Sequence, residues 1–178
     1  MARHLDFEEL ERLREALPPA PRDEGTLEVI YRRPRKGERE QLAEGELSLE
    51  QGLVGDRWVL DADRELERQL TLMQRVHAEL VADGPERRAL CGDNLLVDLE
   101  LAEDNVPPGT RLAIGDAELE VTEVPHLGCS QFRGHFGEGA LKWVNYKPTR
   151  ALKLRGVNAR ILRGGTVRVG DPIRVHRP

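Results

Sequence analysis

The chain has 178 residues, of which 39% are hydrophobic and 33% are charged, and its net charge is −5. A chain of this length can build one well-buried core but is short for two, and its negative charge argues against general affinity for nucleic acids. Because it has no run of about 18 apolar residues, and its acid-rich N-terminus lacks the apolar core of a signal peptide, we expect a cytoplasmic protein without a membrane partner.

The N-terminal part of the chain predicts one helix followed by a linker. Asp6 and Glu9 have the spacing of a capping box, and apolar residues recur along one face over the next three turns. A proline-rich linker begins at Pro18, which cannot continue the helix. Residues 1–24 are therefore interpreted as a helix and linker that precede the main domain, residues 25–178.

The remainder of the chain predicts many short strands and few helices. Strand-like alternation begins at residues 26–33, and a Gly-Asp turn divides residues 110–124 into a hairpin. Two short helices are expected, at residues 75–82 and 139–146. The other expected strands cover residues 38–47, 69–73, 95–99, 157–162, 166–169 and 173–175. This pattern predicts a mainly β fold, a β-barrel with a few short helices, and does not predict a βαβ fold.

One stretch, residues 124–145, concentrates reactive and polar side chains around Cys129. The thiol lies between Gly128 and Ser130, in a loop where the backbone can approach a ligand closely. A thiolate serves as a nucleophile, a sulfur acceptor or a metal ligand, and nearby positive charge favours it. A lone cytosolic cysteine is more often a small inert hydrophobic residue, so the local sequence leaves both interpretations open.

The charge of this region contrasts with that of the rest of the chain. Residues 125–163 contain eight lysines and arginines and one acid, Glu138, so this segment has a net charge of +7 in a chain that is otherwise at −12. Arginine side chains bind phosphate and other oxyanions through paired hydrogen bonds. The alternative is that these arginines are solvated side chains on the faces of strands.

Three motifs stand out: G-L-V-G-D-R at residues 52–57, P-H-L-G-C-S-Q-F at residues 125–132, and L-R-G-V-N-A-R-I-L-R-G-G-T-V-R-V-G-D-P at residues 154–172. Together they resemble the MOSC domain family, named after the C-terminal domain of molybdenum-cofactor sulfurase, and most closely its short, stand-alone bacterial members. The resemblance runs from about residue 26 to the C-terminus. Two departures, Asp93 where many members have Glu and Gly128 where other branches have Pro, suggest a site tuned differently from that of the reductase branch.

The resemblance implies an antiparallel β-barrel, built largely of antiparallel strands, and a single functional cysteine, matching Cys129, that carries sulfur or binds the molybdenum of a pterin cofactor. The pyridoxal-phosphate domain of the full sulfurase is absent, so pyridoxal phosphate is not expected to act in this chain.

Under this interpretation, basic side chains would hold the phosphate of the pterin or an equivalent anion: Arg57, Arg133, Lys142, Arg155 and Arg160. Asn94 and Asn158 would supply amide contacts. His126 would position the cysteine loop, and Asp93 would orient a basic partner. Asp56 is expected to cap or pair within its own turn.

Two other functions use the same residues. A zinc site would combine His126, Cys129 and His135, with Cys91 as a fourth ligand only if the fold brings it near. A non-enzymatic module would bind an anion or a protein through the basic face, because the aromatic residues near the thiol lack the spacing of a platform for single-stranded nucleic acid.

The molybdenum interpretation also predicts partners. These are an anionic cofactor or small substrate, and a sulfur-donor or electron-transfer protein that would make the chain a component of sulfur-transfer or molybdenum-dependent redox chemistry. The sequence leaves the substrate and the oligomeric state open.

Overall fold

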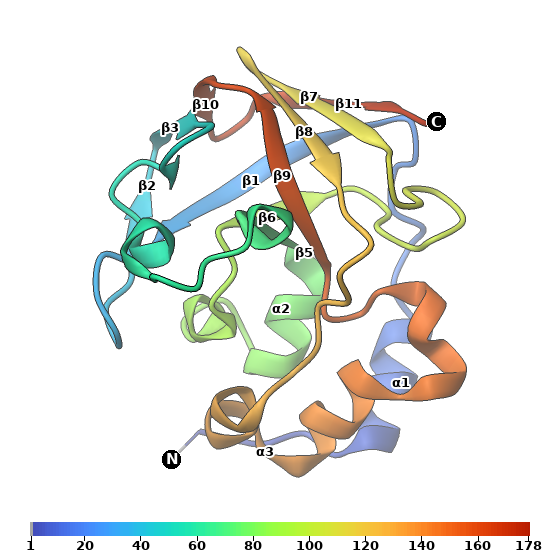
Figure 1. Ribbon diagram of the computed structural model, residues 1–178. Coiled ribbons are helices and arrows are strands. Elements are labelled where there is room, and N and C mark those ends of the chain that lie inside the picture. Colours follow the sequence, from blue (N-terminus) through green and yellow to red (C-terminus); the bar gives the residue numbers. More distant parts are fainter. Residues whose placement is uncertain (1) are drawn as a thin grey trace.

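Seven strands close into a β-barrel in the computed structural model, which describes residues 2–178 (Figure 1). Around the barrel the strand order is β11, β7, β8, β9, β5, β6 and β1, and the pairing of β1 with β11 closes the ring. The barrel strands are β1 (Glu24–Arg32), β5 (Leu70–Gln74), β6 (Leu95–Asp98), β7 (Arg111–Ile114), β8 (Ala117–Val121), β9 (Val157–Arg163) and β11 (Pro172–His176).

The barrel is mixed rather than antiparallel, because β5 and β6 run parallel. The other neighbouring strands of the ring are antiparallel. A parallel pair needs a crossover connection, which here consists of α2 (Arg75–Ala82) and the 3-10 helix η3 (Arg88–Cys91). The sequence predicted both strands and the helix between them. The mainly β barrel is confirmed, but its description as antiparallel is corrected by this one parallel pair.

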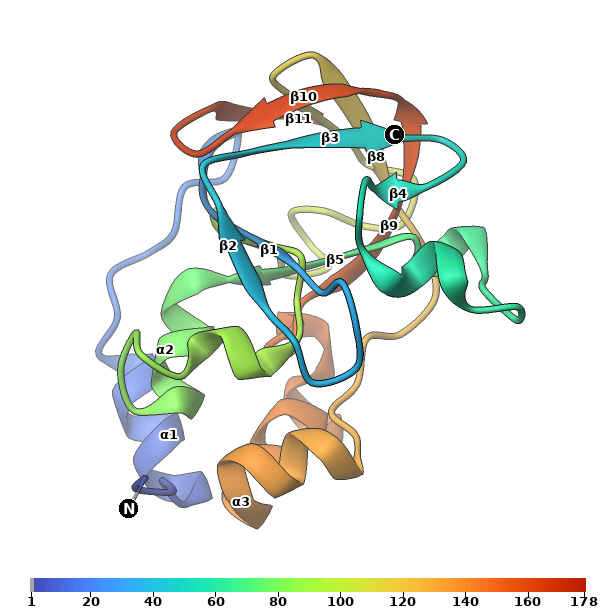
Figure 2. The same ribbon diagram turned by 90° about the vertical axis from the view of Figure 1, so that its left-hand side faces the viewer.

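A smaller sheet and one additional strand lie beside the barrel. The strand β2 (Glu40–Leu42) pairs with β1. The second sheet has the order β10, β3, β4 and lies at the opposite end of the molecule from α1 and α3 (Figure 2). Its strands are β3 (Glu44–Ser48), β4 (Gly52–Leu53) and β10 (Gly165–Arg168). The strand predicted at residues 38–47 is therefore divided between β2 and β3.

Alternating apolar side chains fill the barrel. Leu27, Leu72 and Leu119, from three different strands, are fully buried in this core. Burying a side chain of this size contributes about 1.5–3 kcal/mol, which explains why the alternation specifies the inner face of each strand. The predicted hairpin is confirmed, with β7 and β8 joined at Gly115, whose φ is 55°.

Three helices cover one end of the barrel and build a second apolar core (Figures 1 and 2). The first, α1 (Phe7–Glu15), has the predicted capping box of Asp6 and Glu9. It contacts both α2 and α3 (Ser130–Asn145). Leu10 of α1, Val81 of α2 and Trp143 of α3 are buried together in this core.

The helix α3 begins directly after Cys129, well before the predicted start at residue 139. Gly137, with φ 88° and ψ 175°, divides it into two helical segments. Apolar residues at helical spacing are buried on both sides of this kink, and their packing outweighs the low helix propensity of the glycines. These residues are Phe132, Phe136, Ala140, Trp143 and Val144.

The remaining helices are short 3-10 helices. They are η1 (Arg57–Leu60), η2 (Leu66–Arg68), η3 and η4 (Lys147–Leu152). Within residues 2–178, no helix has the length and apolar character needed to cross a membrane.

Gly156, at the entrance to β9, should tolerate no side chain. Its φ is 98°, and a Cβ atom there would lie 1.9 Å from the backbone carbonyl oxygen of Leu72 in β5. Gly156→Ala should therefore lower the free energy of unfolding, measured in urea, by about 3 kcal/mol or more. Gly37→Ala is the matched control, because Gly37 has a φ of 85° but nothing within 4 Å of its Cβ position. It should cost only about 1–2 kcal/mol, and equal losses in the two variants would contradict the backbone clash.

Candidate functional site

A buried ion-pair network ties the cysteine loop to the barrel. Asp93 lies in the turn between η3 and β6, and its side chain is fully buried. One carboxylate oxygen accepts a hydrogen bond from Arg155 Nη1 at 2.5 Å, and the other lies 2.8 Å from His126 Nε2. Arg155 lies just before β9, and His126 lies in the loop between β8 and α3. Three segments that are distant in sequence therefore meet at Asp93.

Within this network Asp93 is ionised and His126 is neutral. Burial alone would raise the pKa of Asp93, but the charge of Arg155 and the hydrogen bonds from His126 and Arg155 hold that pKa below its ordinary value. Burial, together with the charge of Arg155, lowers the pKa of His126, although Asp93 opposes this shift. Since an ionised carboxylate only accepts hydrogen bonds, the neutral ring donates from Nε2 and keeps a lone pair on Nδ1.

Arg155 is held on several sides and still has one unused donor. Its Nη2 donates to the carbonyl oxygen of Cys91 at 2.7 Å, and its guanidinium lies 5.1 Å from the centre of the Phe132 ring. Its Nε is buried without a hydrogen-bond partner. Because Phe132 lies in the first turn of α3 after Cys129, this stacking places the start of α3 beside the ion-pair network.

A second ion pair holds the same turn from the other side. Arg33 donates from Nε and Nη2 to the two carboxylate oxygens of Asp56, at 3.0 and 2.8 Å, and from Nη1 to the carbonyl oxygen of Gly92 at 3.0 Å. Burial would raise the pKa of Asp56, but hydrogen bonds and charge from Arg33 outweigh it and lower that pKa. Asp56 also caps η1 by accepting from the backbone N–H of Trp58. The turn that carries Asp93 is therefore fixed by two arginines.

Three half-buried arginines near these two ion pairs have no acidic partner within residues 2–178: Arg39, Arg57 and Arg87. Burial, then the charges of Arg33 and Arg57, lower the pKa of Arg39. Burial, then the charges of Arg39 and Arg87, lower the pKa of His135. These groups therefore form one region of uncompensated positive charge, which we call the arginine cluster (Arg39, Arg57 and Arg87).

Arg87 connects the arginine cluster to α3. Its guanidinium lies 5.6 Å from the centre of the Phe136 ring, and its Nη2 donates to the carbonyl oxygen of His135 at 2.7 Å. Its Nη1 is buried without a hydrogen-bond partner. Phe136 packs edge-on against Phe132, the ring beneath Arg155. The first half of α3 thus links the cysteine end of the helix to both arginines.

Side chains hold the loop that presents Cys129, which is itself exposed. Asn145 accepts from the backbone N–H of Gly128 at 2.8 Å and donates to the Gly128 carbonyl oxygen at 3.0 Å. Asn158 donates to the carbonyl oxygen of Val124 at 3.0 Å, where the loop begins. His126 lies between these anchors. The thiol is therefore displayed to solvent from a loop that is fixed on both sides.

The site residues predicted from the sequence do not all lie together in the structure. The structure brings His126 and Arg155 together beside the cysteine loop, with Asp93 between them, and places Arg57 near Arg39. Asn94 and Asn158 are buried and hydrogen-bonded within the protein, Asn94 to Asp56 and to backbone groups. Three others make different contacts: exposed Arg133 lies 3.8 Å from Glu138, Lys142 lies over the ring of Phe7, and Arg160 pairs with Glu120 at 2.8 Å.

The sequence did not single out Arg33, Arg39 or Arg87 as site residues. Residues 32–36 read R-R-P-R-K, a basic run, but nothing local connects it to a cysteine almost a hundred positions later. The connection depends on the strand order, which places β1 next to β6 and so brings Arg33 to Gly92. Half-buried guanidinium groups without acidic partners among the described residues identify Arg39 and Arg87 only once the fold is known.

The structure does not bring the residues proposed for a zinc site together as a set of ligands. Within the described part of the chain, no group of three or more His, Cys, Asp and Glu side chains is placed to hold a metal ion. Nε2 of His126 is already engaged by Asp93, and Cys91 is buried near the carbonyl oxygen of Ala78.

Cys129 should react with iodoacetamide much faster than Cys91 in the native protein. Cys91 is 5% exposed, and burial, then the charge of Asp93, raise its pKa to about 12, so this thiol provides almost no thiolate at neutral pH. Mass spectrometry of digested protein should show a rate ratio of at least about 100. In urea the two rates should converge, and equally slow native rates would contradict the exposed position of Cys129.

His126 should make stability depend on pH below neutrality. The pKa of His126 in the folded protein lies below the ordinary 6.5, so below about pH 6.5 this histidine is protonated in the unfolded chain before it is protonated in the folded protein. The free energy of unfolding therefore falls as the pH decreases. His126→Gln keeps a donor for Asp93 but does not titrate, so it should lose less stability between about pH 7.5 and about pH 5.5. Exposed His176→Gln should follow the wild type in urea denaturation. Identical curves for wild type and His126→Gln would refute this coupling.

Comparison with known proteins identifies a matching family and similar solved structures. The family model "MOSC domain" matches residues 61–174, which is more than half of the chain. The YuaD protein from Bacillus subtilis has a similar structure, with a TM-score of 0.63 and 18% identity over 90% of this chain and 100% of that one. YiiM from Escherichia coli gives a TM-score of 0.57 and 22% identity over 86% of this chain and 70% of that one.

Identities this low show that the fold is shared and nothing further. No curated protein sequence matches the chain. The family model, in contrast, spans the barrel strands from β5 onward, the turn with Asp93, the cysteine loop and β9. The chain therefore belongs to the MOSC domain family.

Proposed function

We propose that this chain binds the molybdenum cofactor and that the Cys129 thiolate ligates the molybdenum or carries a sulfur atom for it. The family is associated with binding of this cofactor. A soft thiolate suits both roles. The observation that carries the proposal is the arginine cluster, which Arg87 connects to α3, the helix that begins after Cys129. Its members are half-buried cations without acidic partners among the described residues, in a protein whose net charge is −5.

The residues present fit a pterin cofactor with an anionic group. Arg87 Nη1 and Arg155 Nε are buried donors without partners. An unsatisfied buried donor costs about 1–3 kcal/mol, and more if it is charged. Oxygen atoms of a bound phosphate would accept from such donors, and guanidinium groups match phosphate geometry. Nothing crowds the position of a Cβ on Gly92, so space is open next to the turn that carries Asp93.

Each group at the site then has a role. The arginine cluster would hold the anionic part of the cofactor, and Cys129 would approach its metal centre. When bound, the cofactor supplies a molybdenum centre that exchanges oxygen or sulfur atoms. Asp93 orients Arg155, and the lowered pKa of His126 keeps its ring neutral at neutral pH with a lone pair on Nδ1. Asn145 and Asn158 would keep the thiol at a fixed position while sulfur is carried or the metal is held.

Cofactor content tests this proposal. The protein is expressed in cells with and without an active molybdenum-cofactor pathway, and bound molybdenum and pterin are measured by elemental analysis and by pterin fluorescence. We expect both in wild-type protein from the competent cells. Cys129→Ala should lose molybdenum, and Arg39→Gln with Arg87→Gln should lower pterin content at least about tenfold, because each charge-assisted hydrogen bond is worth about 1.5–3 kcal/mol.

The matched control is Arg160→Gln, which removes an arginine that is already paired with Glu120 on β8. It should retain the wild-type content. Molybdenum and pterin that remain bound to Cys129→Ala would refute the thiolate role. Phosphate binding that weakens in the arginine variants, in a protein that never acquires molybdenum, would instead support the alternative of a non-enzymatic anion-binding module.

A further inference from the structure

A cavity of about 560 Å³ lies on the side of the barrel that faces the N-terminal helix. Its walls come from the end of α1, the linker at residues 17–21, the junction of β5 and α2, the end of β6 and the chain after η4. This volume is in the range of small-molecule sites, and it is far larger than the about 30 Å³ occupied by a water molecule. None of the residues that form the network around Asp93 lines it.

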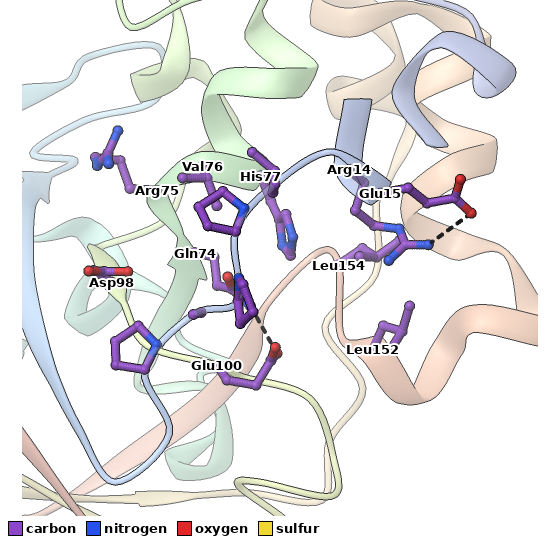
Figure 3. A pocket seen from close by; sticks show the side chains of 15 residues that line it. Arg14, Glu15, Gln74, Arg75, Val76, His77, Asp98, Glu100, Leu152 and Leu154 are labelled. Carbon is purple, nitrogen blue, oxygen red and sulfur yellow. Dashed lines mark hydrogen bonds and ion pairs between the residues drawn. The ribbon is translucent and has the colours of Figure 1, made fainter. Parts of the chain in front are cut away.

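His77 of α2 brings an unused polar group to this cavity. It lines the cavity and is 6% exposed; its Nδ1 is buried, and its Nε2 forms no hydrogen bond within residues 2–178, so Nε2 is the ring nitrogen open to a ligand. Figure 3 shows the imidazole pointing from α2 into the space between Gln74, Arg14 and Leu154. Burial, then the charge of Arg14, lower the pKa of His77 to about 4, so the ring is neutral at physiological pH. A neutral imidazole always has one nitrogen that accepts a hydrogen bond.

Glu100 supplies a carboxylate that is already oriented. Its Oε1 accepts from Gln74 Nε2 at 3.1 Å and from the backbone N–H of Ala102 at 3.0 Å (Figure 3). Its Oε2 has no partner within residues 2–178. Since Gln74 is 4% exposed and buried polar groups are normally hydrogen-bonded, the arrangement fixes one oxygen and leaves the other available to a ligand.

The charges around the cavity favour a cation. Arg14 is bonded to Glu11 and lies 3.9 Å from Glu15, and Arg75 is shared between Glu28 and Glu79. The two arginines are therefore offset by acids. Asp98 and Glu100 form no ion pair within the described residues, which leaves the cavity negative.

We infer that this cavity binds a small organic amine, whose ammonium group donates hydrogen bonds to Glu100 Oε2 and to the imidazole of His77. An ammonium group carries N–H donors for the unused acceptors of Glu100 and His77, and a positive charge that complements Asp98 and Glu100. The apolar part of the ligand would pack on Leu17, Val76 and Leu154 and on the prolines of the linker. The inference concerns a site separate from Cys129 and does not depend on the molybdenum cofactor.

Titration calorimetry with n-hexylamine tests this inference, with n-hexanol and hexanoate as neutral and anionic probes of the same chain length. We expect n-hexylamine to bind at one site with a dissociation constant of about 1 mM or tighter. The other two probes should bind at least about tenfold more weakly. Equal binding of n-hexanol or of hexanoate, or no binding of n-hexylamine, would overturn the inference.

Variants locate the site. Glu100→Gln preserves the shape of the side chain and an acceptor for Gln74, and it should weaken n-hexylamine at least about tenfold. His77→Phe preserves the packing against Trp143 and removes the acceptor, so it should weaken the amine without lowering the melting temperature. Exposed Asp63→Asn, remote from the cavity walls, is the matched control and should bind as the wild type does. Unchanged affinity in Glu100→Gln would overturn the assignment even if His77→Phe failed to fold.

Discussion

An ionised carboxylate buried between a guanidinium and an imidazole is stable only while both partners stay in place, and Asp93 is held in this way by Arg155 and His126. Removal of one partner from such a pair leaves an uncompensated buried charge, which costs about 3–5 kcal/mol. Here the pair connects the turn before β6, the entry to β9 and the cysteine loop. The position of Cys129 relative to the barrel therefore depends on an interaction that does not involve the thiol itself.

The same ion pairs determine where positive charge remains. Asp93 compensates Arg155, and Asp56 compensates Arg33. These two acids are thus used within the two ion pairs, and Arg39, Arg57 and Arg87 have no acidic partner among residues 2–178. A protein with a net charge of −5 can in this way maintain a concentrated positive region, since local pairing decides the field at a site more than the total charge does.

The sequence predicted the local features of the fold well and the long-range ones poorly. The capping box at Asp6, the hairpin at Gly115 and the alternation that fills the barrel depend on neighbouring residues, so they can be recognised along the chain. The parallel pairing of β5 with β6 depends on a crossover, and the early start of α3 depends on the burial of Phe132 and Phe136 against other elements. The cysteine loop was identified from its composition, but Arg39 and Arg87 join the site through tertiary contacts that no local pattern encodes.

The hydrogen bonds that each side chain already makes distinguish the residues that hold the site together from those that could bind a ligand. Asn94 and Asn158 were expected to contact a cofactor, but both amides are buried against backbone groups or Asp56, so they have little left to offer a ligand. Arg87 and Arg155 differ, because each keeps one buried donor without a partner. Buried donors without a partner are rare because each one destabilises the folded state, and a bound anion would accept hydrogen bonds from these two donors. The residue types alone pointed to Asn94, Asn158 and Arg155 but not to Arg87. The hydrogen bonds of the folded chain separate the two asparagines, whose amides are used inside the protein, from the two arginines, which each keep an unused donor.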